Sequence, residues 1–332
     1  MKLIIQIPAL NEEETIEATI LGLPRRIPGI SLVEVLLIDD GSTDATVERA
    51  IQAGADHVLS LGTNRGLARA FMAGLEEALR LGADIVVNTD ADNQYCGEDV
   101  AALVAPILAR KAQIVVGSRP ISEIESFSLL KRNLQYIGSW VVRKASGTDI
   151  PDAPSGFRAY SREAAAQLYV TNTYSYTLET IIQAGRKRLR MVSVPVRVNR
   201  VERPSRLFRT MGHYVRRSMT TIIRVSILYA PLRFFFTLSL LAGLPGLVGI
   251  GRFLWLYAHG GGTGNVQSLV LSGALVGLSA LFAVSGVIAD LILANRFLME
   301  DIRARDMLRD LPYEGSGMQP AKRVRHVVRP SA

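Results

Sequence analysis

The stretch ADIVVNTDADNQY, residues 83–95, decides the fold that we expect for this chain. Its first part is a short run of β-branched apolar residues, which is typical of a buried parallel strand. Asp90 and Asp92 follow, so their carboxylates are expected at the carboxyl end of that strand, where open α/β sheets bind ligands. Two carboxylates one residue apart are suited to Mg²⁺ or Mn²⁺ holding a diphosphate. Asp-x-Asp also occurs in ordinary polar loops, so the rest of the chain has to support this interpretation.

The composition divides the chain into a soluble part and an apolar part. Of its 332 residues 48% are hydrophobic, and the excess lies after Pro231. The net charge of +8 is compatible with nucleic acid, anionic lipid or an acidic substrate. Because the arginines cluster beside the apolar segments, we expect membrane lipids as partners and no nucleic acid. A single cysteine, Cys96, excludes an intramolecular disulfide and fits a reducing compartment.

Three further apolar runs precede the acidic stretch, at residues 2–7, 33–38 and 57–61, and helical patterns separate them. This order predicts an α/β fold with a doubly wound, mostly parallel sheet and a ligand site at the carboxyl edge. No Gly-x-Gly-x-x-Gly follows the first run and the chain has no Gly-Lys-Ser/Thr phosphate loop, so dinucleotide oxidoreductases and P-loop hydrolases fit poorly.

Polar residues follow each of these runs and are candidates for a nucleotide site. A simpler interpretation is that Asn11 caps a helix with an acidic first turn, and that Ser42 or Thr43 caps the helix running to Ala53. Glycine after the third run would let the next helix approach a nucleotide closely. The candidates are Pro8, Asn11, Glu12, Asp39, Asp40, Asn64 and Gly66.

With Gly117-Ser118-Arg119, these motifs resemble an inverting family 2 glycosyltransferase with the GT-A fold. The order is similar to the dolichyl-phosphate mannose synthase and polyprenyl-phosphate glucosyltransferase group, over residues 1 to about 210. The resemblance implies a nucleotide-sugar donor and a divalent metal. Asp90 and Asp92 would then face the diphosphate and metal, and Gln94 occupies the position of a metal-binding glutamine.

Arginines after the acidic stretch are candidates for an acceptor phosphate, since a guanidinium can clamp phosphate with its planar fork. An exposed, solvated basic face is the alternative for each. Arg158 lies in a Ser-Gly-Phe-Arg stretch shared with the family, and the resemblance makes it structural or acceptor-facing. At the family's Ser-Lys turn this chain has Pro204 for the glycine and Arg206 for the lysine. The acceptor candidates are Arg119, Arg132, Arg158, Ser205 and Arg206.

The C-terminal third is expected to associate with a membrane. Residues 205–230 form a basic amphipathic pattern suited to an anionic interface, with a partner-binding or solvated helix as the alternative. Residues 231–295 contain two uncharged stretches of spanning length, and Arg-rich outer flanks predict a hairpin with both ends cytoplasmic. Residues 1–204 would be the cytoplasmic catalytic domain, and residues 296–332 a basic, partly disordered cytoplasmic tail.

A membrane hairpin beside a sugar-nucleotide fold suggests an acceptor that is itself in the membrane, such as undecaprenyl or dolichyl monophosphate. Its phosphate is already anionic at pH 7, so attack on the sugar needs no catalytic base. Inversion is what the resemblance implies, and Asp90, Asp92 and Arg119 are the expected catalytic residues. The sugar stays open, as does the choice of UDP or GDP.

Two other functions compete with this one. The chain could be a glycosyltransferase-fold membrane scaffold or carbohydrate-binding adaptor, although the complete acidic loop favours chemistry. It could also be a processive polysaccharide synthase, although it lacks a Gln-x-x-Arg-Trp motif and further spans. Gly273 and Gly277 would permit close helix packing and hence a homo-oligomer.

Overall fold

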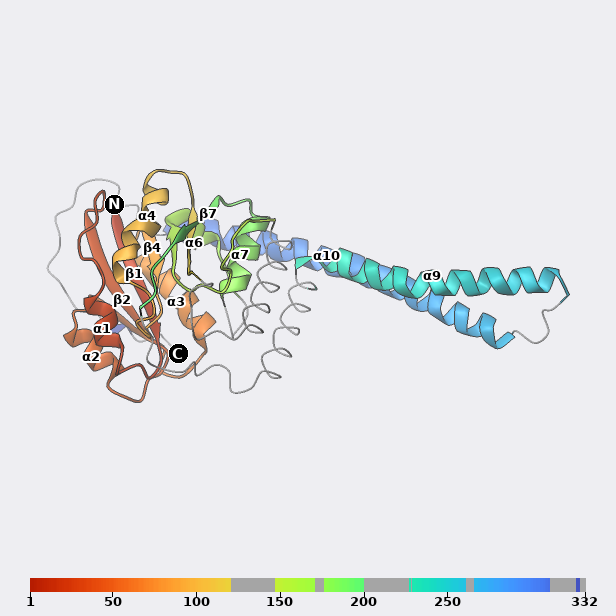
Figure 1. Ribbon diagram of the computed structural model, residues 1–332, viewed down its shortest axis with the longest axis horizontal. Helices are drawn as coiled ribbons and strands as arrows, with labels where there is room; N and C mark the ends of the chain where they lie inside the picture. The colour runs from red at the N-terminus through yellow and green to blue at the C-terminus, as the bar shows by residue number, and fades with distance from the viewer. Residues whose placement is uncertain are drawn as a thin grey trace. The chain divides into compact units, whose positions relative to one another are not determined.

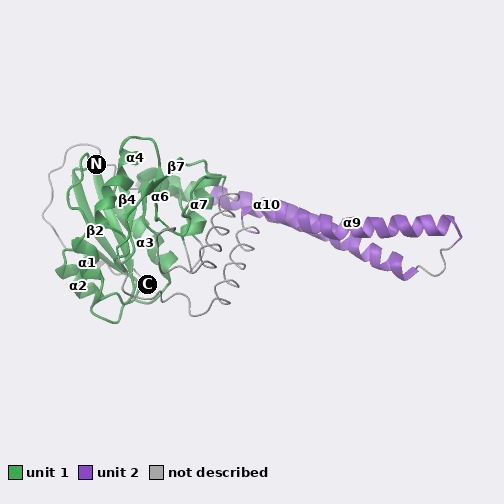
Figure 2. Cartoon of the chain, viewed as in Figure 1, with its two compact units in different colours: residues 1–215, 300–332 green, residues 216–299 purple. Residues whose placement is uncertain are grey.

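The computed structural model describes residues 1–120, 147–170, 176–199, 227, 229–260, 266–310 and 327–328. They fall into two compact units, which are treated separately below (Figure 2). The first unit comprises residues 1–215 together with 300–332, and the second comprises residues 216–299. The first unit contains the acidic stretch, so it carries the candidate site.

The first unit is built on one mixed sheet with the strand order β7-β5-β6-β4-β1-β2-β3-β8 (Figure 1). β6 is antiparallel to both of its neighbours, and the other pairings are parallel, which confirms the mostly parallel sheet that the sequence predicts. β1 pairs with β2 along its whole length and with β4 on its other side, so it lies at the centre. The strands are β1 Lys2–Ala9, β2 Leu32–Asp39, β3 His57–Ser60, β4 Ile85–Asn88, β5 Ile114–Ser118, β6 Arg158–Ser161, β7 Met191–Pro195 and β8 Val327–Val328.

Helices cover both faces of this sheet, because alternate residues of a strand point to opposite faces. Leu3, Ile5 and Ile7 of β1 lie in one core cluster with buried residues of α1, α2 and α4. α3 lies on the other face, where a side chain added at Gly74 would collide with Gln6 of β1. The helices are α1 Ile16–Leu21, α2 Thr46–Gln52, α3 Leu67–Arg80, the 3₁₀ turn η1 Gly97–Asp99, α4 Val100–Leu108, α6 Arg162–Gln167 and α7 Thr177–Arg186.

The predicted helix caps are wrong at two places. α1 begins at Ile16 rather than after Asn11, and α2 begins at Thr46 with no side-chain cap. Asn11 instead has a φ of 53°, a left-handed conformation that asparagine tolerates better than most residues. Its backbone N–H donates to Ser42 Oγ at 3.0 Å, so these polar groups join the first two loops to each other.

The second unit contains α9, Pro231–Ala258, and most of α10, Val266–Asp310. Both helices are long and apolar enough to cross a membrane. They pack closely where small residues meet: Ser239 Oγ lies 3.0 Å from Ser279 Oγ, and a Cβ added at Gly246 would lie 2.9 Å from the carbonyl oxygen of Ser272. Most of their large apolar side chains are exposed, as expected for helices that face lipid.

The C-terminal region differs from the expected tail at two places. α10 continues as one helix to residue 310, and residues 300–310 belong to the first unit. Val327 and Val328 form β8, which pairs in parallel with β3. The basic amphipathic segment predicted at 205–230 falls outside the described residues except for positions 227, 229 and 230.

Candidate functional site

The carboxyl end of β4 is held in place by a network of buried amides. Asn88, the last residue of β4, has no exposed surface. Its Oδ1 accepts a hydrogen bond from Gln6 Nε2 at 2.9 Å, and its Nδ2 donates to the carbonyl oxygen of Gly156 at 2.9 Å and to Tyr176 Oη at 2.8 Å. Gln6 Oε1 has no hydrogen-bond partner among the described residues, but the three hydrogen bonds of the Asn88 side chain are all buried, and such bonds rigidify their surroundings. The acidic loop therefore starts from a fixed point.

The surroundings of the two aspartates of that loop disfavour their charged forms. The pKa of Asp90 is raised to about 7, first by burial and then by the charge of the neighbouring Asp92, while Arg119 and Arg158 oppose the shift. The pKa of Asp92 is also raised, because the surrounding protein removes part of the water near its carboxylate, although one side of the residue stays exposed. The loop therefore concentrates negative charge that the protein itself only partly compensates.

This arrangement fits a divalent cation. Among the described residues no hydrogen bond reaches the carboxylate of Asp90, and the Asp92 carboxylate accepts hydrogen bonds only from the backbone, with the N–H of Gln94 at 3.1 Å from Oδ1. The described part of the chain has no cluster of three or more His, Cys, Asp or Glu side chains suited to a metal. Two carboxylates are nevertheless the usual protein share for Mg²⁺, whose other ligands are substrate phosphates and water. Asp90 and Asp92 would hold such an ion, and the role of Gln94 stays a prediction.

Gly156 lies against the acidic loop with no room for a side chain. A Cβ built on it would lie 2.7 Å from Asp90 Oδ1 and 2.9 Å from Tyr176 Oη. Tyr176 is itself fixed, since its ring stacks on Phe71 of α3 with centroids 3.9 Å apart. The backbone N–H of Gly156 also donates to Tyr95 Oη at 3.2 Å. Glycine is therefore required here for close approach, and the two tyrosines set the position of the loop that carries it.

Arg119, just after β5, is clamped by Asp152. Its Nε donates to Asp152 Oδ2 at 2.8 Å and its Nη2 to Asp152 Oδ1 at 3.0 Å, a bidentate pair, and Asp152 is completely buried. Burial lowers the pKa of Arg119, but the surrounding groups, among them Tyr95, Asp152 and Asp90, raise it overall. The guanidinium is thus held charged and in one orientation near Asp90.

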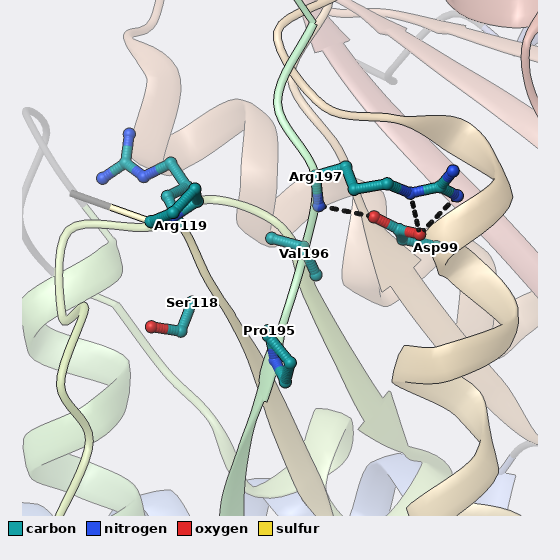
Figure 3. A pocket seen from close by; sticks show the side chains of 7 residues that line it. Asp99, Ser118, Arg119, Pro195, Val196 and Arg197 are labelled. Atoms are coloured by element: carbon teal, nitrogen blue, oxygen red, sulfur yellow. Dashed lines mark hydrogen bonds and ion pairs between the residues drawn. The ribbon is translucent and has the colours of Figure 1, made fainter. Parts of the chain in front are cut away.

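A hollow of about 480 Å³ opens beside Arg119 (Figure 3). Figure 3 shows Arg119 and Arg197 on two sides of it, with their guanidinium groups directed away from each other. Arg197 binds Asp99 through two nitrogens, at 3.0 and 2.7 Å. The lining combines charged, hydroxyl and apolar groups: Asp99, Ser118, Arg119, Pro120, Pro195, Val196 and Arg197.

Arg158 has a different environment from Arg119. It lies in β6 with no exposed surface, and its guanidinium donates to the carbonyl oxygens of Ala153, Ser155 and Thr177 and to Thr180 Oγ1. An arginine bonded on every side in this way has no face left for a phosphate. The structure therefore does not support Arg158 as a ligand of the acceptor phosphate. It supports the other expectation, that Arg158 has a structural role.

The loops after β1, β2 and β3 form the other half of this edge. Asp39 Oδ1 accepts the backbone N–H of Ser42 at 2.8 Å, and its Oδ2 accepts the hydroxyl of Ser60 at 3.0 Å. Asp40 accepts the backbone N–H groups of Arg65 at 2.7 Å and Gly66 at 2.9 Å. Both aspartates are buried, so they first of all join neighbouring loops to one another.

The remaining nucleotide candidates lie in the same loops. Asn11 Oδ1 accepts the backbone N–H of Thr43 at 2.8 Å, and the backbone N–H of Glu12 donates to Thr46 Oγ1 at 2.8 Å. Asn64 Oδ1 accepts the N–H of Gly66, which precedes α3 with a φ of 92° that favours glycine. Pro8 is buried in β1 opposite Ile38. The fold thus brings all seven candidates to one edge.

Comparison with known proteins identifies the family. The family model described as "Glycosyl transferase family 2" matches residues 4–169, which is half of the chain. The chain belongs to glycosyl transferase family 2.

Named relatives of this glycosyltransferase act on lipid phosphates. It is 28% identical to the undecaprenyl-phosphate mannosyltransferase of Micrococcus luteus, over 59% of this chain and 83% of the relative. It is 29% identical to the UDP-N-acetylglucosamine–dolichyl-phosphate N-acetylglucosaminyltransferase of Methanococcus voltae, over 58% of this chain and 83% of the relative. Homologues of the chain are thus polyprenyl-phosphate sugar transferases.

A solved structure shows the same fold. The glucosyl-3-phosphoglycerate synthase of Mycobacterium tuberculosis, in complex with Mn²⁺, UDP and glucosyl-3-phosphoglycerate, matches with a TM-score of 0.50 and 24% identity. The match covers 68% of this chain and 78% of that one. It confirms the predicted GT-A fold of the glycosyltransferase.

Several residues that shape the site of this glycosyltransferase were not predicted. Their buried contacts join residues that are 33 or more positions apart in the sequence. These residues are Asp152, Tyr95, Tyr176 and Asn88. A sequence shows which residues can pair but not which ones meet. Arg132, Ser205 and Arg206, expected at the acceptor phosphate, lie outside the described residues.

Proposed function

We propose that this protein transfers a sugar from a UDP- or GDP-sugar to a polyprenyl monophosphate, with inversion at the anomeric carbon. One observation carries the proposal: the poorly compensated carboxylates of Asp90 and Asp92 lie near Arg119, which the buried Asp152 holds in one orientation. A cation-binding acidic pair next to a fixed guanidinium suits a reaction between two phosphate-bearing substrates. The named relatives support the same class of acceptor.

The donor would bind across the carboxyl edge of the sheet. Its nucleotide would lie over the loops that hold Asn11, Glu12 and Asp39, and its diphosphate would point to Asp90 and Asp92. A bound Mg²⁺ or Mn²⁺ would supply charge stabilisation for the departing diphosphate. Asp90 and Asp92 would hold that ion, and the fixed position of their loop would keep the sugar aligned for attack.

The acceptor would approach from the hollow beside Arg119. Its phosphate oxygen forms the new bond to the anomeric carbon while the bond from that carbon to the diphosphate breaks, and the nucleoside diphosphate leaves with the electron pair. No proton has to be moved, because the attacking phosphate is already anionic at pH 7. Arg119 would orient that phosphate, and the apolar lining from Pro120, Pro195 and Val196 suits the first carbons of a prenyl chain.

The apolar helices α9 and α10 agree with an acceptor that lies in a membrane. The Arg-rich flanks of these helices support a multi-pass arrangement with the catalytic unit on the cytoplasmic side of the cell membrane. A soluble acceptor would need neither helix, which makes the lipid the better candidate.

Transfer of radiolabelled sugar tests the proposal. Purified full-length protein in detergent would be offered UDP- and GDP-sugars with undecaprenyl or dolichyl phosphate and Mn²⁺ or Mg²⁺. We expect a lipid-linked product from one donor, lost on adding a chelator and in Asp92→Asn. The control is Asp301→Asn, at an exposed position of α10, which should keep full activity. A folded protein that forms no product with any donor would favour the scaffold function, and a growing polymer would favour a polysaccharide synthase.

A further inference from the structure

The last part of α10 is docked onto the catalytic unit by one face of the helix. From residue 300 to residue 309 the covered positions are 300, 303, 304, 307 and 308, and the other positions are exposed. This spacing of i, i+3, i+4, i+7 and i+8 is that of one helical face packed against protein. Glu300 and Ala304 are only 5% and 2% exposed. We call residues 300–308 the docking segment.

Charged contacts join the docking segment to three elements of the catalytic unit. Glu300 Oε2 lies 3.1 Å from Lys187 Nζ, at the C-terminal end of α7, with both side chains largely buried. Arg303 forms an ion pair with Glu76 of α3 and lies 4.7 Å from the ring centroid of Tyr169, in the loop after α6. Removing either partner of the Glu300–Lys187 pair leaves a buried charge, so this pair fixes geometry. The Arg303–Glu76 pair is partly exposed, at 28% and 31%, and Arg303 is held in addition by its position over the Tyr169 ring.

The same two helices support the acidic loop from their other ends. α3 carries Phe71, whose ring stacks on Tyr176 at the start of α7. Tyr176 Oη in turn accepts a hydrogen bond from Asn88 and touches Gly156, which has no clearance from the Asp90 carboxylate. The docking segment therefore contacts both helices near their C-terminal ends, and their N-terminal ends meet at the site through Phe71 and Tyr176.

We propose that the docking segment positions the catalytic site through α3 and α7, so that full activity requires this end of the second apolar helix to be in place. Glu300 and Arg303 act as positioning residues and do not touch substrate. By drawing the far ends of α3 and α7 together they keep Tyr176 against Asn88 and Gly156. Loss of the contacts would let Tyr176 shift and would move the Asp90 loop. This inference goes beyond the sugar transfer itself and assigns a coupling role to a membrane-associated helix.

The sharpest test compares two arginines two positions apart. Arg303→Met removes the docking charge and keeps an apolar stem, whereas Arg305→Met removes an exposed charge whose only described ion pair is with Asp301 on the same helix. We expect Arg303→Met to lower kcat about tenfold at a temperature where the protein stays folded, since small misplacements at a reacting centre are costly, with the donor KM unchanged. Arg305→Met should behave as wild type.

Hydrogen exchange supplies a readout that does not depend on catalysis. In full-length protein in detergent, Arg303→Met should raise amide exchange around residues 71 and 176–180, far along α3 and α7 from the substitution, and Arg305→Met should not. The exchanged pair Glu76→Arg with Arg303→Glu restores the ion pair but not the contact of Arg303 with Tyr169, so it should recover part of both protection and kcat relative to Arg303→Glu alone, and it decides the matter if Arg303→Met fails to fold. The proposal is overturned if Arg303→Met only lowers the melting temperature, or if the exchanged pair restores neither readout.

Discussion

The two halves of the ligand edge use aspartate in opposite ways. After β2, Asp39 and Asp40 are buried and their oxygens accept hydrogen bonds from loop N–H and hydroxyl groups. After β4, Asp90 and Asp92 receive almost none, and the pKa of each is raised. The first half is a scaffold that its own carboxylates hold together. The second half keeps charge available for a ligand, at a cost in stability, as binding and catalytic sites commonly do.

The largest effect is expected from neutralising the second half. Asp90→Asn keeps the shape of the side chain but removes the charge that would hold the diphosphate and its cation. Sugar transfer should fall about a thousandfold, which corresponds to about 4 kcal/mol of lost charge stabilisation. Transfer of labelled sugar to polyprenyl phosphate measures this. The melting temperature should not fall, because no described group bonds the carboxylate. Activity within about threefold of wild type would remove Asp90 from the proposed metal site.

The same substitution in the first half should have the opposite profile. Asp40→Asn places an amide donor against the backbone N–H of Arg65 or Gly66, and leaving a buried donor unsatisfied costs about 2 kcal/mol. We expect a lower unfolding midpoint. We also expect weaker binding of the nucleotide-sugar substrate, because the loop that carries Asn64 loosens. Thermal unfolding beside Asp306→Asn, an exposed control on α10, checks this. An unchanged midpoint with lost activity would mean that Asp40 serves the ligand directly.

Two arginines sharpen the same contrast. Arg119→Lys keeps the charge beside Asp152 but loses the bidentate geometry, so we expect the KM for the polyprenyl phosphate to rise about tenfold while the donor KM stays unchanged. Arg158→Lys should instead destabilise the fold, because it leaves several buried carbonyl oxygens without a hydrogen-bond donor. Steady-state kinetics with each substrate varied, together with thermal unfolding, separates the two results. Equal behaviour of both variants would contradict their assignment to different roles.

The sequence was sufficient for the features that depend on short-range pattern. β-branched runs placed the parallel strands, and loop residues such as Asp39 and Asp90 were correctly expected at strand ends because strand polarity decides that. The antiparallel β6 was missed, since Arg158–Ser161 has no distinctive pattern. The roles of Arg119 and Arg158 could not be separated either, because they depend on whether Asp152 or a ring of carbonyls surrounds the guanidinium. Those contacts come from packing between distant segments.

A further prediction concerns the pH dependence of stability in the second half. The pKa of Asp90 is about 7 in the folded protein, against 3.8 for an ordinary aspartate. Between those two values the folded state keeps a proton that the unfolded chain has released, so the free energy of unfolding decreases as pH rises from about 4 to about 7. Asp90→Asn has no such proton and should lose this part of the slope. In chelator, the melting temperature of wild type should therefore drop more than that of Asp90→Asn between pH 5 and pH 8. Parallel curves would show that Asp90 is ionised at little cost. If Mn²⁺ raises the melting temperature of wild type at pH 8 but not that of Asp90→Asn, the charge of the Asp90 carboxylate contributes to cation binding.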